Sequence, residues 1–167
     1  PVGSSSKTTI FILLNFVKTP YSKNDRVLAP NSRKELSELL QDLFLTSDPF
    51  LPCGLRTRHK WGPTVNSNSK EISLREINRI IEHSNKDLTI TVEAGLPLAT
   101  LQTALAEKKQ WLAVDWPWGS RPNSHPSTAG TVGGLIARGL SGSLRQRYMG
   151  VRDQIIGIEI LRSNGIS

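Results

Sequence analysis

The amino-acid sequence predicts an α+β domain, and two kinds of pattern carry most of that prediction. Leucines recur at helical spacing over residues 36–43 and 98–105, whereas residues 88–93 are rich in β-branched side chains. A chain of 167 residues is long enough for one sizeable core and short for two domains. We therefore expect one domain in which strands separated by helices pair in parallel in a small sheet.

The first half of the chain carries two helix-start patterns. Ser32 is a predicted N-cap with Glu35 three residues later. The apolar side chains that follow at helical spacing are Leu36, Leu39, Leu40, Leu43 and Phe44. Residues 49–53 are predicted to form a short strand. Ser73 and Glu76 repeat the capping-box pattern, which predicts a second helix over residues 74–81.

The second half is predicted to contain strands at 88–93 and 111–114 and a helix at 98–108. Residues 115–126 hold three prolines and a glycine, which predict a long loop without regular structure. Its Trp116 and Trp118 either pack against a planar ligand or partner, or close the protein surface. Isoleucines then alternate over residues 156–160 before an Asn-Gly pair, which predicts a strand that ends in a turn.

Small residues gather at 127–134 (STAGTVGG), immediately before a predicted helix at 135–138. Glycines allow close approach of a ligand to the backbone, and amides at a helix N-terminus suit a pyrophosphate. Arg145, Arg147 and Arg152 follow within residues 141–153 (SGSLRQRYMGVRD), which suits a phosphorylated ligand.

Taken in order, these motifs resemble the flavin-binding domain of the vanillyl-alcohol oxidase and p-cresol methylhydroxylase (PCMH) superfamily. Within it, they are most similar to the E-subunit-like proteins of glycolate oxidase. The resemblance covers residues 27–165. It also rests on VLAPNSRKEL at 27–36, LPCG at 51–54, WG at 61–62 and DLTITVEAG at 87–95.

This resemblance implies a PCMH-type FAD-binding fold, with a small parallel sheet, helices and a partial second subdomain. Residues 1–26 fall outside it as an unassigned N-terminal extension. Residues 27–167 are then an FAD-binding domain that is incomplete at its C-terminal end, because the family continues with a second glycine-rich segment and a substrate domain.

By resemblance, FAD is the expected cofactor. The residues expected to line its site are Gly54, Thr57, His59, Ser127, Thr128, Gly130, Thr131, Gly133, Gly134, Ser141 and Gly142. No catalytic residue is assigned.

Three positions of the chain raise questions about this site. In the first pyrophosphate loop, Arg56 stands where the family has a glycine. Its side chain either blocks the phosphate, so that FAD is lost, or binds the phosphate through its guanidinium. Met149 likewise stands at a family glycine. His59 is similar to a histidine that sugar and alditol oxidases of the superfamily join covalently to the flavin; the alternative is a solvated histidine.

Two function classes remain open. The chain is an FAD-binding domain or fragment of an FAD-linked oxidoreductase of the glycolate oxidase E-subunit type. Alternatively, it is a non-catalytic subunit that keeps the flavoprotein fold and docks into a larger assembly of protein subunits.

Composition narrows the partners further. The formal net charge of +7 attracts anions or acidic surfaces. The basic residues are not interleaved with aromatic ones on one element, so no nucleic-acid partner is predicted. The single Cys53 fits the cytoplasm or another reducing compartment, and it shows no paired spacing with the histidines, so no metal site is predicted. The apolar run 10–17 is shorter than the ~20 residues of a membrane span, and we expect a buried strand or docking segment there.

Overall fold

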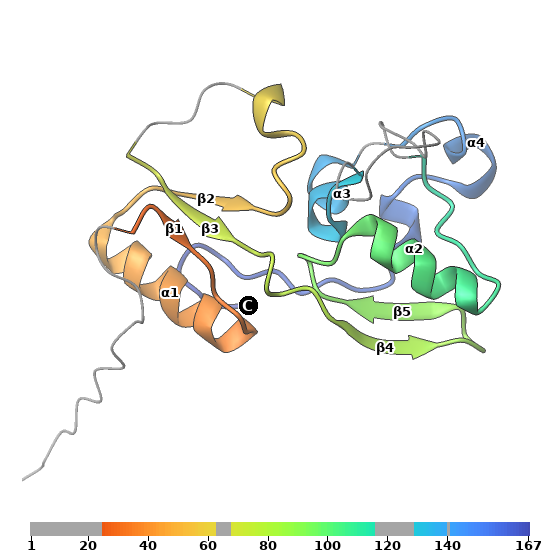
Figure 1. The fold of residues 1–167 in the computed structure, drawn as a ribbon, viewed down its shortest axis with the longest axis horizontal. Helices are drawn as coiled ribbons and strands as arrows, with labels where there is room; N and C mark the ends of the chain where they lie inside the picture. Colours follow the sequence, from red (N-terminus) through yellow and green to blue (C-terminus); the bar gives the residue numbers. More distant parts are fainter. Residues whose placement is uncertain (1–24, 63–67, 116–128, 140) are drawn as a thin grey trace, which may run out of the picture.

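The computed structural model describes residues 25–62, 68–115, 129–139 and 141–167. The apolar run 10–17, most of the proline-rich loop, Ser127 and Thr128 lie outside these residues. The described elements form two groups, one around a parallel sheet and one around an antiparallel hairpin (Figure 1). None of the described helices is long and apolar enough to cross a membrane.

The first group is a three-stranded parallel sheet with one helix against it. It contains β1 (Val27–Leu28), α1 (Arg33–Thr46), β2 (Phe50–Cys53) and β3 (Lys70–Ser73). The strand order is β1-β3-β2, so β3 pairs with both neighbours. A 3-10 turn, η1 (His59–Trp61), lies between β2 and β3 in the chain. The predicted small parallel sheet is confirmed.

Helix α1 begins and packs largely as its sequence predicts. The Ser32 side chain accepts a hydrogen bond from the Glu35 amide at 3.3 Å, and the Glu35 carboxylate accepts one from the Asn31 amide at 2.8 Å. Its buried face packs against β1 and β3 in a cluster formed by Leu28, Leu39, Leu40, Leu43 and Ile72. Phe44 is 56% exposed, so the apolar face is narrower than the spacing predicted.

The second group is a β-hairpin covered by a helix, with three further short helices. It contains β4 (Ile80–Ser84), β5 (Thr89–Val92), α2 (Leu98–Glu107), α3 (Val132–Arg138), α4 (Arg145–Tyr148) and the 3-10 turn η3 (Arg152–Gln154). Strands β4 and β5 pair antiparallel, and β4 lies where no strand was predicted. One side of α2 packs on β5 through Leu101 and Leu105, and Leu98 packs against Leu135 of α3.

Three predicted elements are wrong. Residues 74–81 form a turn and the start of β4 instead of a helix, because Ser73 is itself a buried end of the central strand β3. The isoleucines in this region, β-branched and stiff, favour strands over the helix that the capping-box pattern indicated. Residues 111–114 and 156–160 form no strand.

The C-terminal segment joins the two groups. Ile155 packs on the core beneath α3, and Leu161 packs on the core beneath α1. Glu159 forms an ion pair with Arg33, and the Ser37 hydroxyl donates to the Gly165 carbonyl at 2.6 Å. The predicted turn is present. The alternating Ile156, Ile158 and Ile160 are exposed at 86%, 57% and 64%.

Candidate functional site

Two loops far apart in the sequence meet between the two groups of elements. One follows β2 and the other precedes α3. A Cβ atom on Gly54 would lie 2.6 Å from the Thr131 hydroxyl oxygen, so this contact requires glycine. Gly130 has φ +86°, and a Cβ there would lie 2.9 Å from Arg58 Nη1 and 3.1 Å from Thr57 Oγ1. The structure thus brings together four predicted site residues: Gly54, Thr57, Gly130 and Thr131.

The first backbone amides of α3 are hydrogen-bonded within the protein. Thr131 is the buried N-cap, and its hydroxyl accepts from the Gly134 amide at 3.2 Å. The Val132 amide donates to the Leu96 carbonyl at 2.9 Å, and the Gly133 amide to the Ala94 carbonyl at 2.8 Å. The amides that open this helix are therefore engaged inside the protein. A phosphate group near α3 needs other donors.

Arg56 occupies a backbone position that suits glycine. Its φ of +56° lies in the left-handed region, which costs a residue with a side chain about 1–2 kcal/mol. Its Nε donates to the Glu71 carboxylate at 2.6 Å, so the guanidinium is engaged at the edge of the site. His59 follows at the start of η1 with an exposed side chain.

Arg58 and Arg138 both lie near one aromatic ring, that of Trp61. The Arg58 Cζ lies 5.6 Å and the Arg138 Cζ 5.8 Å from the Trp61 ring centroid, which is within cation–π range. Burial lowers the pKa of Arg58 from its usual value, and the positive charge of Arg138 lowers it further. The Arg58 Nε is buried and has no hydrogen-bond partner among the described residues. Two positive charges thus lie close enough to affect each other, and such a pair would favour a bound anion.

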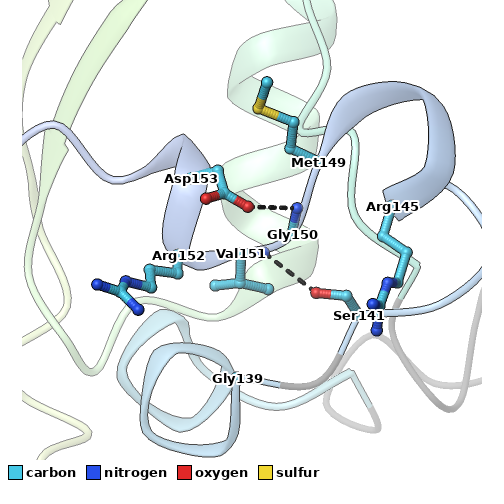
Figure 2. A pocket seen from close by; sticks show the side chains of 8 residues that line it. All are labelled: Gly139, Ser141, Arg145, Met149, Gly150, Val151, Arg152 and Asp153. Carbon is cyan, nitrogen blue, oxygen red and sulfur yellow. Dashed lines mark hydrogen bonds between the residues drawn. The ribbon is translucent and has the colours of Figure 1, made fainter.

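A pocket of about 410 Å³ lies next to the C-terminal end of α3. Gly139 and Ser141 are among the residues that line it. The Ser141 hydroxyl accepts from the Val151 amide at 3.1 Å, and the Asp153 carboxylate accepts from the Gly150 amide at 2.9 Å (Figure 2). Arg145 and Arg152 also line the pocket, and in Figure 2 the Arg152 guanidinium points away from Ser141.

Asp115 and Met149 shape the chain around this pocket. The Asp115 carboxylate accepts from the Ser143 hydroxyl at 3.0 Å and from the Leu144 amide at 2.7 Å, which fixes the loop that contains Gly142. Met149 has φ +68°, a conformation that favours the glycine of the family pattern.

The only cysteine is not a nucleophile of this site. Burial first, and the Glu71 carboxylate second, raise the pKa of the Cys53 thiol to about 11. The thiol therefore stays protonated at neutral pH, and the reactive form of cysteine is the thiolate. Cys53 has a packing role at the end of β2.

Sequence reasoning missed Arg58 and Arg138. Arg58 lies directly between the predicted site residues Thr57 and His59, and Arg138 ends the predicted helix after the glycine-rich loop. Their positions beside predicted site residues could have marked them as candidates, but only the fold shows that both guanidinium groups lie near the Trp61 ring.

Comparisons with known proteins agree with this geometry. Residues 24–166 match a sequence family described as an FAD binding domain. Glycolate oxidase subunit GlcD of Bacillus subtilis is 26% identical over 144 residues, which are 86% of this chain and 29% of that protein. Glycolate oxidase subunit GlcE of Escherichia coli is 33% identical over 86 residues, which are 52% of this chain and 23% of that subunit. The chain spans about a quarter of the length of these relatives.

Solved structures share the fold at lower identity. Berberine bridge enzyme from Eschscholzia californica is similar with a TM-score of 0.66 and 21% identity, over 83% of this chain and 26% of that one. The predicted fold class is confirmed, with its mixture of helices and strands and its small parallel sheet.

Proposed function

The chain belongs to the FAD binding domain family, and from that premise we propose that it binds FAD between the loops at 54–59 and 129–134. The observation that carries the proposal is the contact of Gly54 with Thr131 and of Gly130 with Thr57, which brings the two expected cofactor loops together. When bound, FAD accepts and donates electrons for an oxidoreductase. The chain's own residues would bind and orient it.

The expected cofactor residues take different parts in this proposal. Thr57 and Gly130 would contact the diphosphate region, and Gly54 and Thr131 hold the two loops together. Ser141 and Gly142 would extend the site into the pocket at the end of α3. Gly133 and Gly134 would support the site indirectly, because their amide hydrogen bonds hold the start of α3 in place.

The finer proposal is an FAD-binding part of a glycolate oxidase E-subunit type protein that acts on a 2-hydroxy acid. The similarity to a subunit of that oxidase supports it. Because the chain spans about a quarter of its relatives, substrate oxidation would belong to the whole protein. Residues 27–167 are the proposed FAD-binding unit, with residues 1–26 outside it.

A second candidate is a non-catalytic subunit that keeps the fold and docks into a larger assembly. Three exposed isoleucines within five residues, Ile156, Ile158 and Ile160, favour this function, because large exposed apolar areas mark interaction sites. Arg56, with its engaged guanidinium at a family glycine, is consistent with an altered cofactor loop.

FAD binding distinguishes the two candidates. We expect the purified protein to bind FAD saturably at one site in a fluorescence titration, and to bind riboflavin more weakly because riboflavin lacks phosphate. Flavin fluorescence that remains with the protein after acid precipitation would indicate a covalent flavin, for which His59 is the candidate residue. No FAD binding, together with retention in a complex of protein subunits, would contradict the first candidate and support the second.

The same titration on Arg56→Gly tests the altered loop. Glycine relieves the left-handed strain and removes the side chain, so FAD affinity should rise. Arg56→Ala is the matched control, because it removes the guanidinium but keeps the strain. Equal affinity of wild type and both variants would show that Arg56 does not limit the site.

A further inference from the structure

The two arginines beside Trp61 form no salt bridge with any of the described residues. All 14 Asp and Glu residues of the chain lie in the part that the structure describes. Arg33, Arg56 and Arg79 each form a salt bridge, but no salt bridge among the described residues includes Arg58 or Arg138. A pair of like charges without a carboxylate is unfavourable in the protein alone, and an anionic ligand would relieve it.

We propose that Arg58 and Arg138 form a guanidinium clamp for the diphosphate of a dinucleotide, and that this clamp replaces the amide donors which the start of α3 cannot offer. The inference rests on the proposed FAD function for its location. It adds two things to that function: the residues that recognise the ligand, and the chemical group that they recognise. That group is a diphosphate, which FAD, ADP and inorganic pyrophosphate share.

The geometry favours phosphate on three grounds. The Arg58 Nη2 has one long contact, 3.5 Å to the Ala129 carbonyl, and its buried Nε has none among the described residues, so donors remain for a ligand. Arginine presents a planar fork of donors that matches phosphate oxygens in pairs. Both guanidinium groups lie within cation–π range of the Trp61 ring, which helps to hold them in place.

The position of the clamp also fits a dinucleotide. Gly130 packs against the Arg58 guanidinium, so the clamp lies at the contact of the two loops. Arg138 immediately precedes Gly139, the first residue that lines the pocket around Ser141. A ligand held by its diphosphate at Arg58 and Arg138 can therefore extend one end toward that pocket.

Isothermal titration of the full chain with FAD, ADP, inorganic pyrophosphate and riboflavin tests the clamp. We expect Arg58→Gln and Arg138→Gln each to weaken binding of the three diphosphate ligands at least about tenfold, the effect of losing one strong charged hydrogen bond. Riboflavin binding should change by less than about twofold. Arg26→Gln is the control, because it removes one positive charge from an exposed arginine outside the site. It should leave all affinities within about twofold.

Thermal unfolding without ligand checks that the variants fold. Arg58→Gln should unfold at the wild-type temperature or above it, because it removes a partly buried, unpaired charge. If Arg58→Gln does not fold, Arg138→Gln decides the question, because Arg138 is exposed.

The outcomes separate the clamp from the proposed function. Tight FAD binding that neither arginine variant weakens would overturn the clamp and leave the FAD function intact. Binding of ADP and pyrophosphate that both variants weaken, without FAD binding, would support the clamp and contradict the FAD function. No binding of any diphosphate by the wild type would overturn both.

Discussion

Replacing Gly95 with alanine should destabilise the protein by at least about 3 kcal/mol, at the upper end of the cost of overpacking. Gly95 lies in the turn between β5 and α2. A Cβ at this position would overlap the backbone carbonyl oxygens of Leu74 and Ile77, and its amide donates to the Ile77 carbonyl at 2.8 Å. Backbone atoms cannot rotate away as a side chain can. The segment between β3 and β4, which contains Leu74 and Ile77, must therefore shift. Urea unfolding monitored by circular dichroism measures the change.

Gly157→Ala is the matched control for this prediction. A Cβ on Gly157 would meet no atom within 4 Å. Its alanine variant should therefore stay within about 0.5–1 kcal/mol of wild type, or gain stability through the less flexible unfolded chain. Equal unfolding midpoints for the two variants would show that the contact at Gly95 is not formed in solution.

Leu98→Ala should cost about 2–5 kcal/mol, the range for truncation of a fully buried leucine. The Leu98 side chain is 0% exposed and packs with Val114, Leu135 and Val151. Its amide also donates to the Gly130 carbonyl at 3.0 Å, so the cavity forms directly beneath a proposed cofactor loop. Since domains of this size are stabilised by about 5–15 kcal/mol, the loss is a large fraction of the total. We expect FAD affinity to fall with it.

Leu45→Ala is the control for the core substitution. Leu45 is 81% exposed on α1, and alanine is the stronger helix former, so the change should be within about 0.5 kcal/mol. Denaturant unfolding of both variants gives the comparison. A Leu98→Ala protein as stable as Leu45→Ala would contradict the packing of α2 against α3.

The sequence predicted the elements whose signals are local. Helix α1 follows from the cap at Ser32 and the leucine spacing after it, because both act within a few residues. The same capping pattern at Ser73 failed, since pairing of β3 with two neighbouring strands outweighs a local helix preference. Alternation at Ile156–Ile160 failed for a related reason: a strand also needs a partner, and none of the described strands provides one.

The candidate site was predictable in outline from its glycines. Gly54 and Gly130 were expected in the cofactor loops, and both lie where the loops touch. The sequence could not show whether the backbone amides and guanidinium groups near these loops already have partners within the protein. Engagement of the Val132 and Gly133 amides depends on carbonyls from the segment before α2, and the approach of Arg58 to Arg138 depends on the meeting of both loops.

Amide hydrogen exchange with and without FAD tests the central claim, that two distant loops together hold the cofactor. We predict slower exchange on adding FAD at residues 54–59 and 129–135, with unchanged exchange in α1, whose core is separate from the site. Exchange that is unchanged in both loops at saturating FAD, or slowed in only one of them, would contradict the claim.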